Sequence, residues 1–172
     1  MTILPDPKTT SAVLILDGSE VSLEQVQAVA EGRCQVVLSS APAFLERIAR
    51  GSAFLERLLA EDGVIYGVTT GYGDSCTRLV PSADMEDLPR QLYTFHGCGL
   101  GEVLSHEAAR AVVMVRLVSL CRGYSGVCVE LLERLVWLLQ HDVMPVIPEE
   151  GSVGASGDLT PLSYLAAVLC GE

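Results

Sequence analysis

Basic residues are scarce in this sequence, which has half as many Lys and Arg as Asp and Glu. The counts are 11 and 22 in 172 residues, for a formal net charge of −11. A phosphate backbone or an anionic membrane surface would repel such a chain, so the composition predicts neither nucleic acid nor a membrane as partner. Long apolar runs are missing too, since Ala111–Cys121 is interrupted by Arg116 and falls short of a bilayer span.

Paired-cysteine motifs and a basic N-terminal stretch are also absent. The six cysteines are scattered without a CxxC spacing, which argues against a zinc site and against a disulfide framework. Four of them have apolar or Gly-rich neighbours, so we expect reduced and packed thiols. No basic segment precedes the first short apolar run, so no secretory signal is predicted and a cytoplasmic protein is expected.

Hydrophobic residues make up 49% of the sequence, enough for a substantial core. Val13–Leu16 and Gln35–Leu38 are short runs of the β type. Between them, Ser22 and Gln25 form a capping box that predicts a helix through about Ala30.

Apolar residues recur at helical spacing from Ser40 onward, and Gly51 is the expected weak point or break of this helix. Residues 63–82 are rich in Gly, Thr and Ser and predict a loop. The remaining helices are predicted at Met85–Phe95, at Ser105–Cys121 with Ser105 as N-cap, at Ser125–Gln140, and from Asp158 with Pro161 in the first turn.

The sequence therefore predicts a mainly α fold within one domain, residues 1–172. A small α/β N-terminal segment, about 1–60, precedes the loop and long helices of 61–172. Leu165–Leu169 is an apolar face with no partner left in the chain to cover it, which predicts a fragment or a piece of a larger assembly.

The segment Gly151–Asp158, GSVGASGD, is on composition alone a flexible loop that ends in a helix N-cap. Together with the residues that follow, it resembles the signature of the histidine, phenylalanine and tyrosine ammonia-lyase family. In this family an Ala-Ser-Gly triplet cyclises to the prosthetic group 4-methylidene-imidazol-5-one (MIO). The resemblance assigns this role to Ala155, Ser156 and Gly157, with no metal and no external cofactor.

The residue types of the triplet suit this chemistry. The nitrogen of Gly157 must approach the carbonyl of Ala155 closely, and a residue without Cβ obstructs that approach least. Loss of the Ser156 hydroxyl as water leaves a methylidene carbon, an electrophile that no unmodified side chain supplies. A helix opening at Asp158 would direct N–H groups toward negative charge on the ring.

A second motif, Tyr66–Gly73, reads YGVTTGYG. A tyrosine in such a loop is most often a packing residue. The motif is similar to the family's loop, however, which implies that Tyr66 removes the β-proton of the substrate and that Gly73 lies at the substrate. Its three glycines are expected to hold conformations that other residues avoid.

A third motif covers Phe95–Gly101 and resembles the stretch in which the family sets side-chain specificity. Histidine lyases carry Ser-His at the first pair, phenylalanine lyases Phe-Leu and tyrosine lyases His-Leu, whereas this chain has Phe95-His96. His96 can hydrogen-bond an imidazole or a phenol, so both substrates stay open, and Phe95 in place of Ser favours tyrosine. His106 and His141 are interpreted as structural.

The resemblance implies the helical fold shared with fumarase and aspartase, in its N-terminal portion, with the C-terminal helical region absent. It also implies elimination of ammonia from an aromatic amino acid, tyrosine or histidine, giving coumarate or urocanate. Family members are mostly homotetramers whose active sites draw residues from different subunits. The alternatives are an MIO-dependent 2,3-aminomutase and an inactive fragment or scaffold piece.

Overall fold

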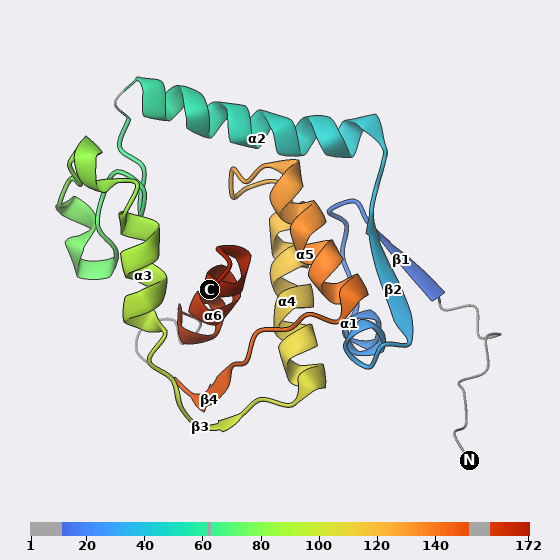
Figure 1. Ribbon diagram of the computed structural model, residues 1–172. Coiled ribbons are helices and arrows are strands. Elements are labelled where there is room, and N and C mark those ends of the chain that lie inside the picture. The colour runs from blue at the N-terminus through green and yellow to red at the C-terminus, as the bar shows by residue number, and fades with distance from the viewer. Residues whose placement is uncertain (1–11, 62, 152–158) are drawn as a thin grey trace, which may run out of the picture.

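The computed structural model describes residues 12–61, 63–151 and 159–172 of the chain (Figure 1). Helices dominate, as predicted. The α-helices are α1 (Leu23–Ala30), α2 (Pro42–Ala60), α3 (Leu88–His96), α4 (His106–Cys121), α5 (Val129–His141) and α6 (Leu159–Leu169). The strands are β1 (Ala12–Leu16), β2 (Cys34–Leu38), β3 (Leu100–Val103) and β4 (Pro148–Glu150), and short 3₁₀ turns lie at Gly73–Thr77 and Ser82–Asp84.

The N-terminal segment forms a β–α–β unit. β1 and β2 pair in parallel, in register from Ala12 with Cys34 to Leu16 with Leu38. Both arms of the predicted capping box are present at α1, because the Ser22 hydroxyl accepts the Gln25 N–H and the Gln25 side chain accepts the Ser22 N–H. Local sequence signals therefore predicted this unit correctly.

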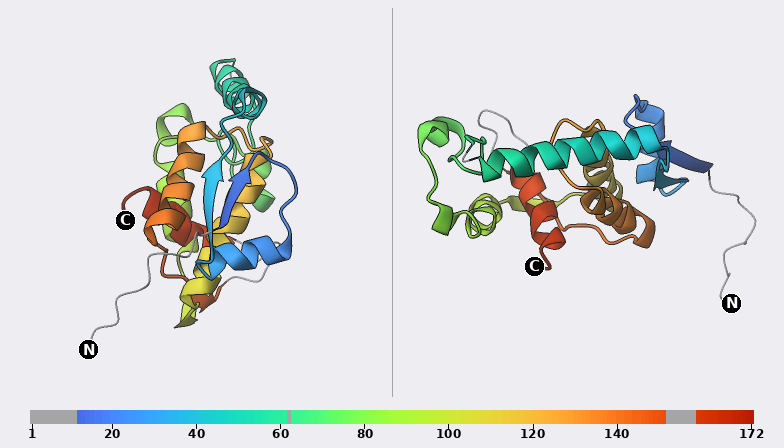
Figure 2. Two further views of the ribbon diagram at one scale, coloured as in Figure 1. Left: turned by 90° about the vertical axis from the view of Figure 1, so that its right-hand side faces the viewer. Right: turned by 90° about the horizontal axis from the view of Figure 1, so that it is seen from above.

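The helix α2 is continuous through Gly51, so the predicted break at this residue is wrong. A Cβ added to Gly51 would lie 3.1 Å from the carbonyl oxygen of Gly123 and 3.6 Å from Cα of Gly126. These two residues belong to the connection between α4 and α5, over which α2 lies (Figures 1 and 2). The glycine thus permits a close crossing of two backbones and does not interrupt the helix.

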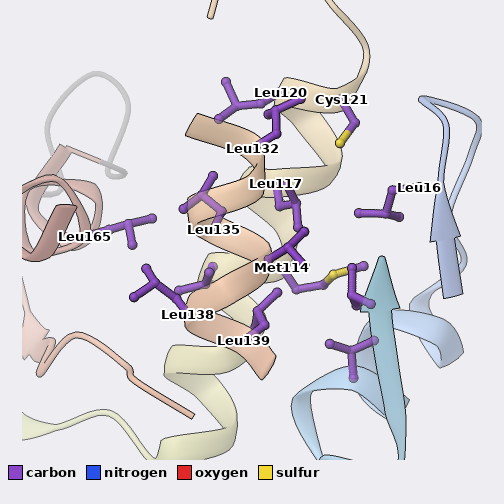
Figure 3. Packing of buried hydrophobic residues seen from close by; sticks show 14 of the residues in the cluster. Leu16, Met114, Leu117, Leu120, Cys121, Leu132, Leu135, Leu138, Leu139 and Leu165 are labelled. Atoms are coloured by element: carbon purple, nitrogen blue, oxygen red, sulfur yellow. The ribbon is translucent and has the colours of Figure 1, made fainter. Parts of the chain in front are cut away.

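The core lies between α4 and α5, with the β–α–β unit on one side and α6 on the other (Figure 3). Val113, Met114 and Leu117 of α4 and Leu132 of α5 have no exposed surface. Leu16 and Val36 from the strands extend this cluster. Burial of such side chains stabilises the fold by about 1.5–3 kcal/mol each.

The helix α6 joins this core, contrary to the expectation that its apolar face would stay uncovered. Leu165 is 3% exposed and points toward α5, and Leu162, Val168 and Leu169 pack against the same cluster (Figure 3). The other side of α6 packs on α3. Earlier helices cover the face because the chain folds back on itself, which periodicity along the sequence does not reveal.

Helix starts differ from prediction at two places. α3 begins at Leu88, since Ser82–Asp84 forms a 3₁₀ turn ahead of it, and α5 begins at Val129 after Gly126, whose φ is +66°. Ser105 caps α4 as predicted, accepting the N–H of Ala108 at 3.2 Å. No helix within the described ranges combines the length and apolar character needed to cross a bilayer.

The prediction of four packed cysteines is wrong. Cys121 is buried and Cys34 is half-buried, whereas the other four are exposed: Cys76, Cys98, Cys128 and Cys170. These four lie in turns or at helix ends, where apolar neighbours in sequence do not enclose the thiol.

Candidate active site

Two buried threonines organise the loop that carries Tyr66. The Thr69 hydroxyl accepts the N–H of Ile65 at 2.7 Å and donates to the carbonyl of Gly63 at 3.1 Å. The Thr70 hydroxyl accepts the N–H of Gly67 at 3.2 Å. Thr70 as a whole residue is 2% exposed. Neither threonine was predicted to have a role. Their hydroxyls form hydrogen bonds with backbone groups of the loop that lack partners in a helix or sheet.

The side chain of Tyr66 is held at its oxygen. The N–H of Gly73 donates to this phenol oxygen at 2.9 Å, and the ring meets that of Tyr72 edge-on with centroids 6.4 Å apart. Gly73 and Gly67 have φ values of +54° and +72°, which confirms for these two the predicted glycine conformations. Tyr66 is nonetheless 65% exposed, so its oxygen is placed by the loop and open to a partner molecule.

Tyr72 is the less exposed of the two loop tyrosines. Burial raises the pKa of its hydroxyl above the usual value, and the neighbouring Tyr66 adds to the rise. Tyr66, at 65% exposed, is the tyrosine whose oxygen a partner molecule can reach, so it is the better candidate for proton transfer.

Phe95 and His96 end the helix α3, which Gly97 closes. Phe95 is 77% exposed and its ring lies edge-on to the His96 imidazole, with centroids 5.2 Å apart. Among the described residues, His96 has no hydrogen-bond partner, so both ring nitrogens are open to a ligand. The pair lines a pocket of about 720 Å³ that also includes Gly71 and Tyr72 of the loop.

The segment after His96 is tied to the segment that leads into the predicted triplet. β3 and β4 pair antiparallel, with Leu100 opposite Glu150 and Val103 opposite Pro148 (Figure 1). Neither strand was predicted, because runs of three or four residues carry no clear alternation. Their pairing brings residues 97–101 beside residues 148–151.

Ala155, Ser156 and Gly157 lie outside the described residues, as does the predicted N-cap Asp158. Their flanks are in contact, since a Cβ added to Gly151 would lie 2.8 Å from Cβ of Thr160. Thr160 has no exposed surface, and its carbonyl accepts the Ser163 hydroxyl at 2.6 Å.

All three motifs border one further pocket, of about 440 Å³. Gly67 and Tyr72 from the loop and His96 from α3 form one part of its wall, and α6 residues from Leu159 to Cys170 form another. Tyr66 does not line this pocket. The structure therefore brings the loop, His96 and the helix after the triplet together around a mostly apolar pocket. No cluster of three or more His, Cys, Asp or Glu side chains suited to a metal ion occurs in the described part of the chain.

Comparison with known proteins gives a consistent result. Residues 21–172 match the family model described as aromatic amino acid lyase. A histidine ammonia-lyase of Gloeobacter violaceus is 46% identical over 159 residues, covering 92% of this chain and 30% of that protein. One of Anaeromyxobacter dehalogenans is 45% identical, with 92% and 31% covered.

Among solved structures, tyrosine aminomutase from Streptomyces globisporus superposes with a TM-score of 0.85 at 35% identity, covering 94% of this chain and 30% of that one. The chain thus spans about a third of the length of the curated relatives that it matches.

Proposed function

This chain belongs to the aromatic amino acid lyase family, and from that premise we propose that the protein eliminates ammonia from an aromatic L-amino acid, with histidine as the first candidate. The observation that carries the proposal is the pocket bordered at once by the tyrosine loop, by His96 and by the helix that follows the Ala-Ser-Gly triplet. A hollow of mostly apolar lining with a few polar groups suits an aromatic substrate.

Ala155, Ser156 and Gly157 are proposed to form MIO, which supplies an electrophilic carbon for the substrate amine. The contact between Gly151 and Thr160 supports this proposal, because it brings together the two ends of the segment that contains the triplet. Tyr66 is proposed to take the β-proton of the substrate. Support comes from its exposed phenol oxygen, held by the N–H of Gly73, because a charge-assisted bond of this kind stabilises a phenolate.

Phe95 and His96 are proposed to contact the substrate ring. An imidazole without a partner in the described residues can donate to or accept from either a histidine or a tyrosine side chain. The names of the curated relatives favour histidine. Tyrosine, which the Phe95-His96 pair favours, stays the second candidate, and the aminomutase likeness keeps a 2,3-aminomutase as an alternative.

The proposed assembly is a homotetramer with active sites shared between subunits. Tyr66 and Phe95 are 65% and 77% exposed, and such aromatic side chains suit a surface that meets another chain. In that arrangement Tyr66 would serve the triplet of a neighbouring subunit.

The test uses the complete protein that carries this sequence, incubated with histidine, tyrosine and phenylalanine in turn. Ultraviolet absorbance of a conjugated acid identifies the substrate, and a β-amino acid among the products would identify a mutase. An intact mass lower by two waters per chain reports closure of the triplet. Ser156→Ala is expected to abolish turnover with the circular dichroism spectrum unchanged, and a wild-type rate in this variant contradicts the proposal.

Tyr66→Phe is expected to lower kcat by several orders of magnitude, because the general base is lost. Tyr72→Phe is the matched control, since the same hydroxyl group is removed from a half-buried tyrosine in the same loop. This control is expected to stay within a few-fold of wild type. Equal rates for the two variants would return Tyr66 to a packing role.

A further inference from the structure

One hydrogen bond joins the helix after the triplet to the turn after His96. The N–H of Gly99 donates to the phenol oxygen of Tyr164 at 3.1 Å. Tyr164 lies in α6, four residues beyond Thr160, and is half-buried. Nothing in the sequence analysis or in the proposed chemistry gives this tyrosine a role.

Gly99 is held from its other side as well. A Cβ at Gly99 would lie 2.9 Å from Cβ of Pro148 and 3.3 Å from the carbonyl oxygen of Glu150, so the turn lies directly on β4. The N–H of Leu104 donates to the carbonyl of Ile147 at 2.9 Å and extends this contact. The turn therefore packs between β4, which precedes residues 152–158, and α6, which follows them.

Gly99 lies three positions beyond His96, a span of at most about 10 Å. A shift of the turn is thus passed to the end of α3, where the imidazole lies. We propose that Tyr164 is a positioning residue, whose bond to Gly99 sets the distance between His96 and the helix α6. Through this distance Tyr164 determines which aromatic side chain the pocket accepts. The inference rests on the proposed function and deepens it.

The bond has the strength that such a role needs. A single hydrogen bond between neutral groups changes an equilibrium by about fivefold, and loss of the acceptor leaves a partly buried N–H without a partner. A misplacement of about 1 Å in an active site lowers rates by as much as about a hundredfold. Discrimination between substrates is therefore the sensitive readout, whereas global stability changes little.

The experiment compares Tyr164→Phe with Tyr124→Phe in the complete protein. Tyr124 is the matched control because the same hydroxyl is removed from a tyrosine that is 89% exposed, lies between α4 and α5, and lines neither pocket that includes His96. Intact mass, thermal midpoint, and kcat/KM for histidine and for tyrosine are measured. In Tyr164→Phe the mass loss of two waters stays complete, and kcat/KM for the better substrate falls by about tenfold. The ratio of the two kcat/KM values changes by about fivefold, whereas Tyr124→Phe matches wild type in both respects.

A second substitution tests the route through His96. In a His96→Ala background, Tyr164→Phe is expected to have no further effect on the ratio, since coupled residues are not additive. An unchanged ratio in Tyr164→Phe, or equal effects of Tyr164→Phe and Tyr124→Phe, overturns the positioning role.

If Tyr164→Phe does not fold, the rate of hydrogen exchange at the Gly99 amide is measured in the wild-type protein instead. An exchange rate as fast as that of an unstructured peptide refutes the proposal. If the wild-type protein releases no unsaturated acid from any of the amino acids, the proposed function itself fails. If the wild-type protein is active and Tyr164→Phe behaves as Tyr124→Phe does, only the positioning role fails and the proposed function stands.

Discussion

Arg110 offers the sharpest test of how this fold is held together. Its guanidinium is almost fully buried on α4 and reaches the C-terminal ends of two other helices. Nε donates to the carbonyls of Val29 and Ala30 at 3.2 and 3.1 Å, and Nη1 donates to the carbonyl of Leu139 at 3.1 Å. Nη1 also bonds the carboxylate of Asp142 at 2.6 Å. A cation at the negative ends of α1 and α5 is favourable on electrostatic grounds.

The cost of removing this side chain follows from its partners. The carbonyl of Val29 also accepts the N–H of Gly32, so its loss is small. Within the described residues the carbonyls of Ala30 and Leu139 have no other donor, and each orphaned carbonyl costs about 1 kcal/mol. Asp142 is 63% exposed, so its ion pair with Arg110 adds no more than about 1 kcal/mol. Arg110→Met is therefore expected to lower the free energy of unfolding by about 2–3 kcal/mol.

Urea unfolding followed by circular dichroism measures the change. Arg134→Met is the control, because Arg134 is an exposed arginine on α5, and substitutions of this kind usually stay within about 0.5 kcal/mol. Arg110→Lys is expected to fall between wild type and Arg110→Met, since an ammonium cannot reach the same set of acceptors. If Arg110→Met unfolded at the same urea concentration as Arg134→Met, the hydrogen bonds of Arg110 would contribute nothing to stability and the reasoning would be refuted.

Three further predictions follow from the structure. The hydrogen bond from His106, and to a lesser extent that from Arg110, lowers the pKa of Asp142 below its usual 3.8. The Asp142 carboxylate therefore contributes its full stabilisation above pH 3.8, and this stabilisation is lost as the pH falls through the lowered pKa. Unfolding of wild type and Asp142→Asn at a series of pH values should therefore show a difference at pH 6 that shrinks toward pH 2; a constant difference contradicts this. Burial raises the pKa of the Cys121 thiol to about 11, so iodoacetamide at pH 8 should label it only after denaturant is added, as peptide mass mapping would show; labelling as fast as at exposed Cys76 would contradict its burial. Gly67→Ala puts a Cβ 2.8 Å from Tyr72 Cε1 at a φ of +72°, a strain of about 1–2 kcal/mol that should displace Tyr66 and lower kcat about tenfold, whereas an unchanged kcat would show that the loop tolerates the side chain.

Much of the fold follows from local sequence signals. The capping box at Ser22 and Gln25, the N-cap Ser105 and the β-type run Val13–Leu16 each act over a few residues, so each predicts its element without knowledge of the rest of the chain. The same holds for the Gly-rich loop, whose unusual φ values at Gly67 and Gly73 match its composition.

The candidate site divides in the same way. Its loop, its Phe95-His96 pair and its triplet are continuous motifs and were identified by sequence. The pocket shared by the loop, His96 and α6 was not predicted, because β3 and β4 are too short to show alternation and their pairing joins residues about fifty positions apart. Tyr164 was missed for a related reason, since the bond that makes it relevant is to Gly99, 65 residues earlier.

The sequence by itself determined where the capped helices α1 and α4 begin, which segment forms the Gly-rich loop, and which family this chain belongs to, since each of these depends on neighbouring residue types. Only the tertiary structure decided that Gly51 serves a backbone crossing, that earlier helices cover α6, and that most of the cysteines stay exposed. These outcomes depend on contacts between distant segments, and a contact of this kind is a property of two surfaces in space, which neither segment specifies alone.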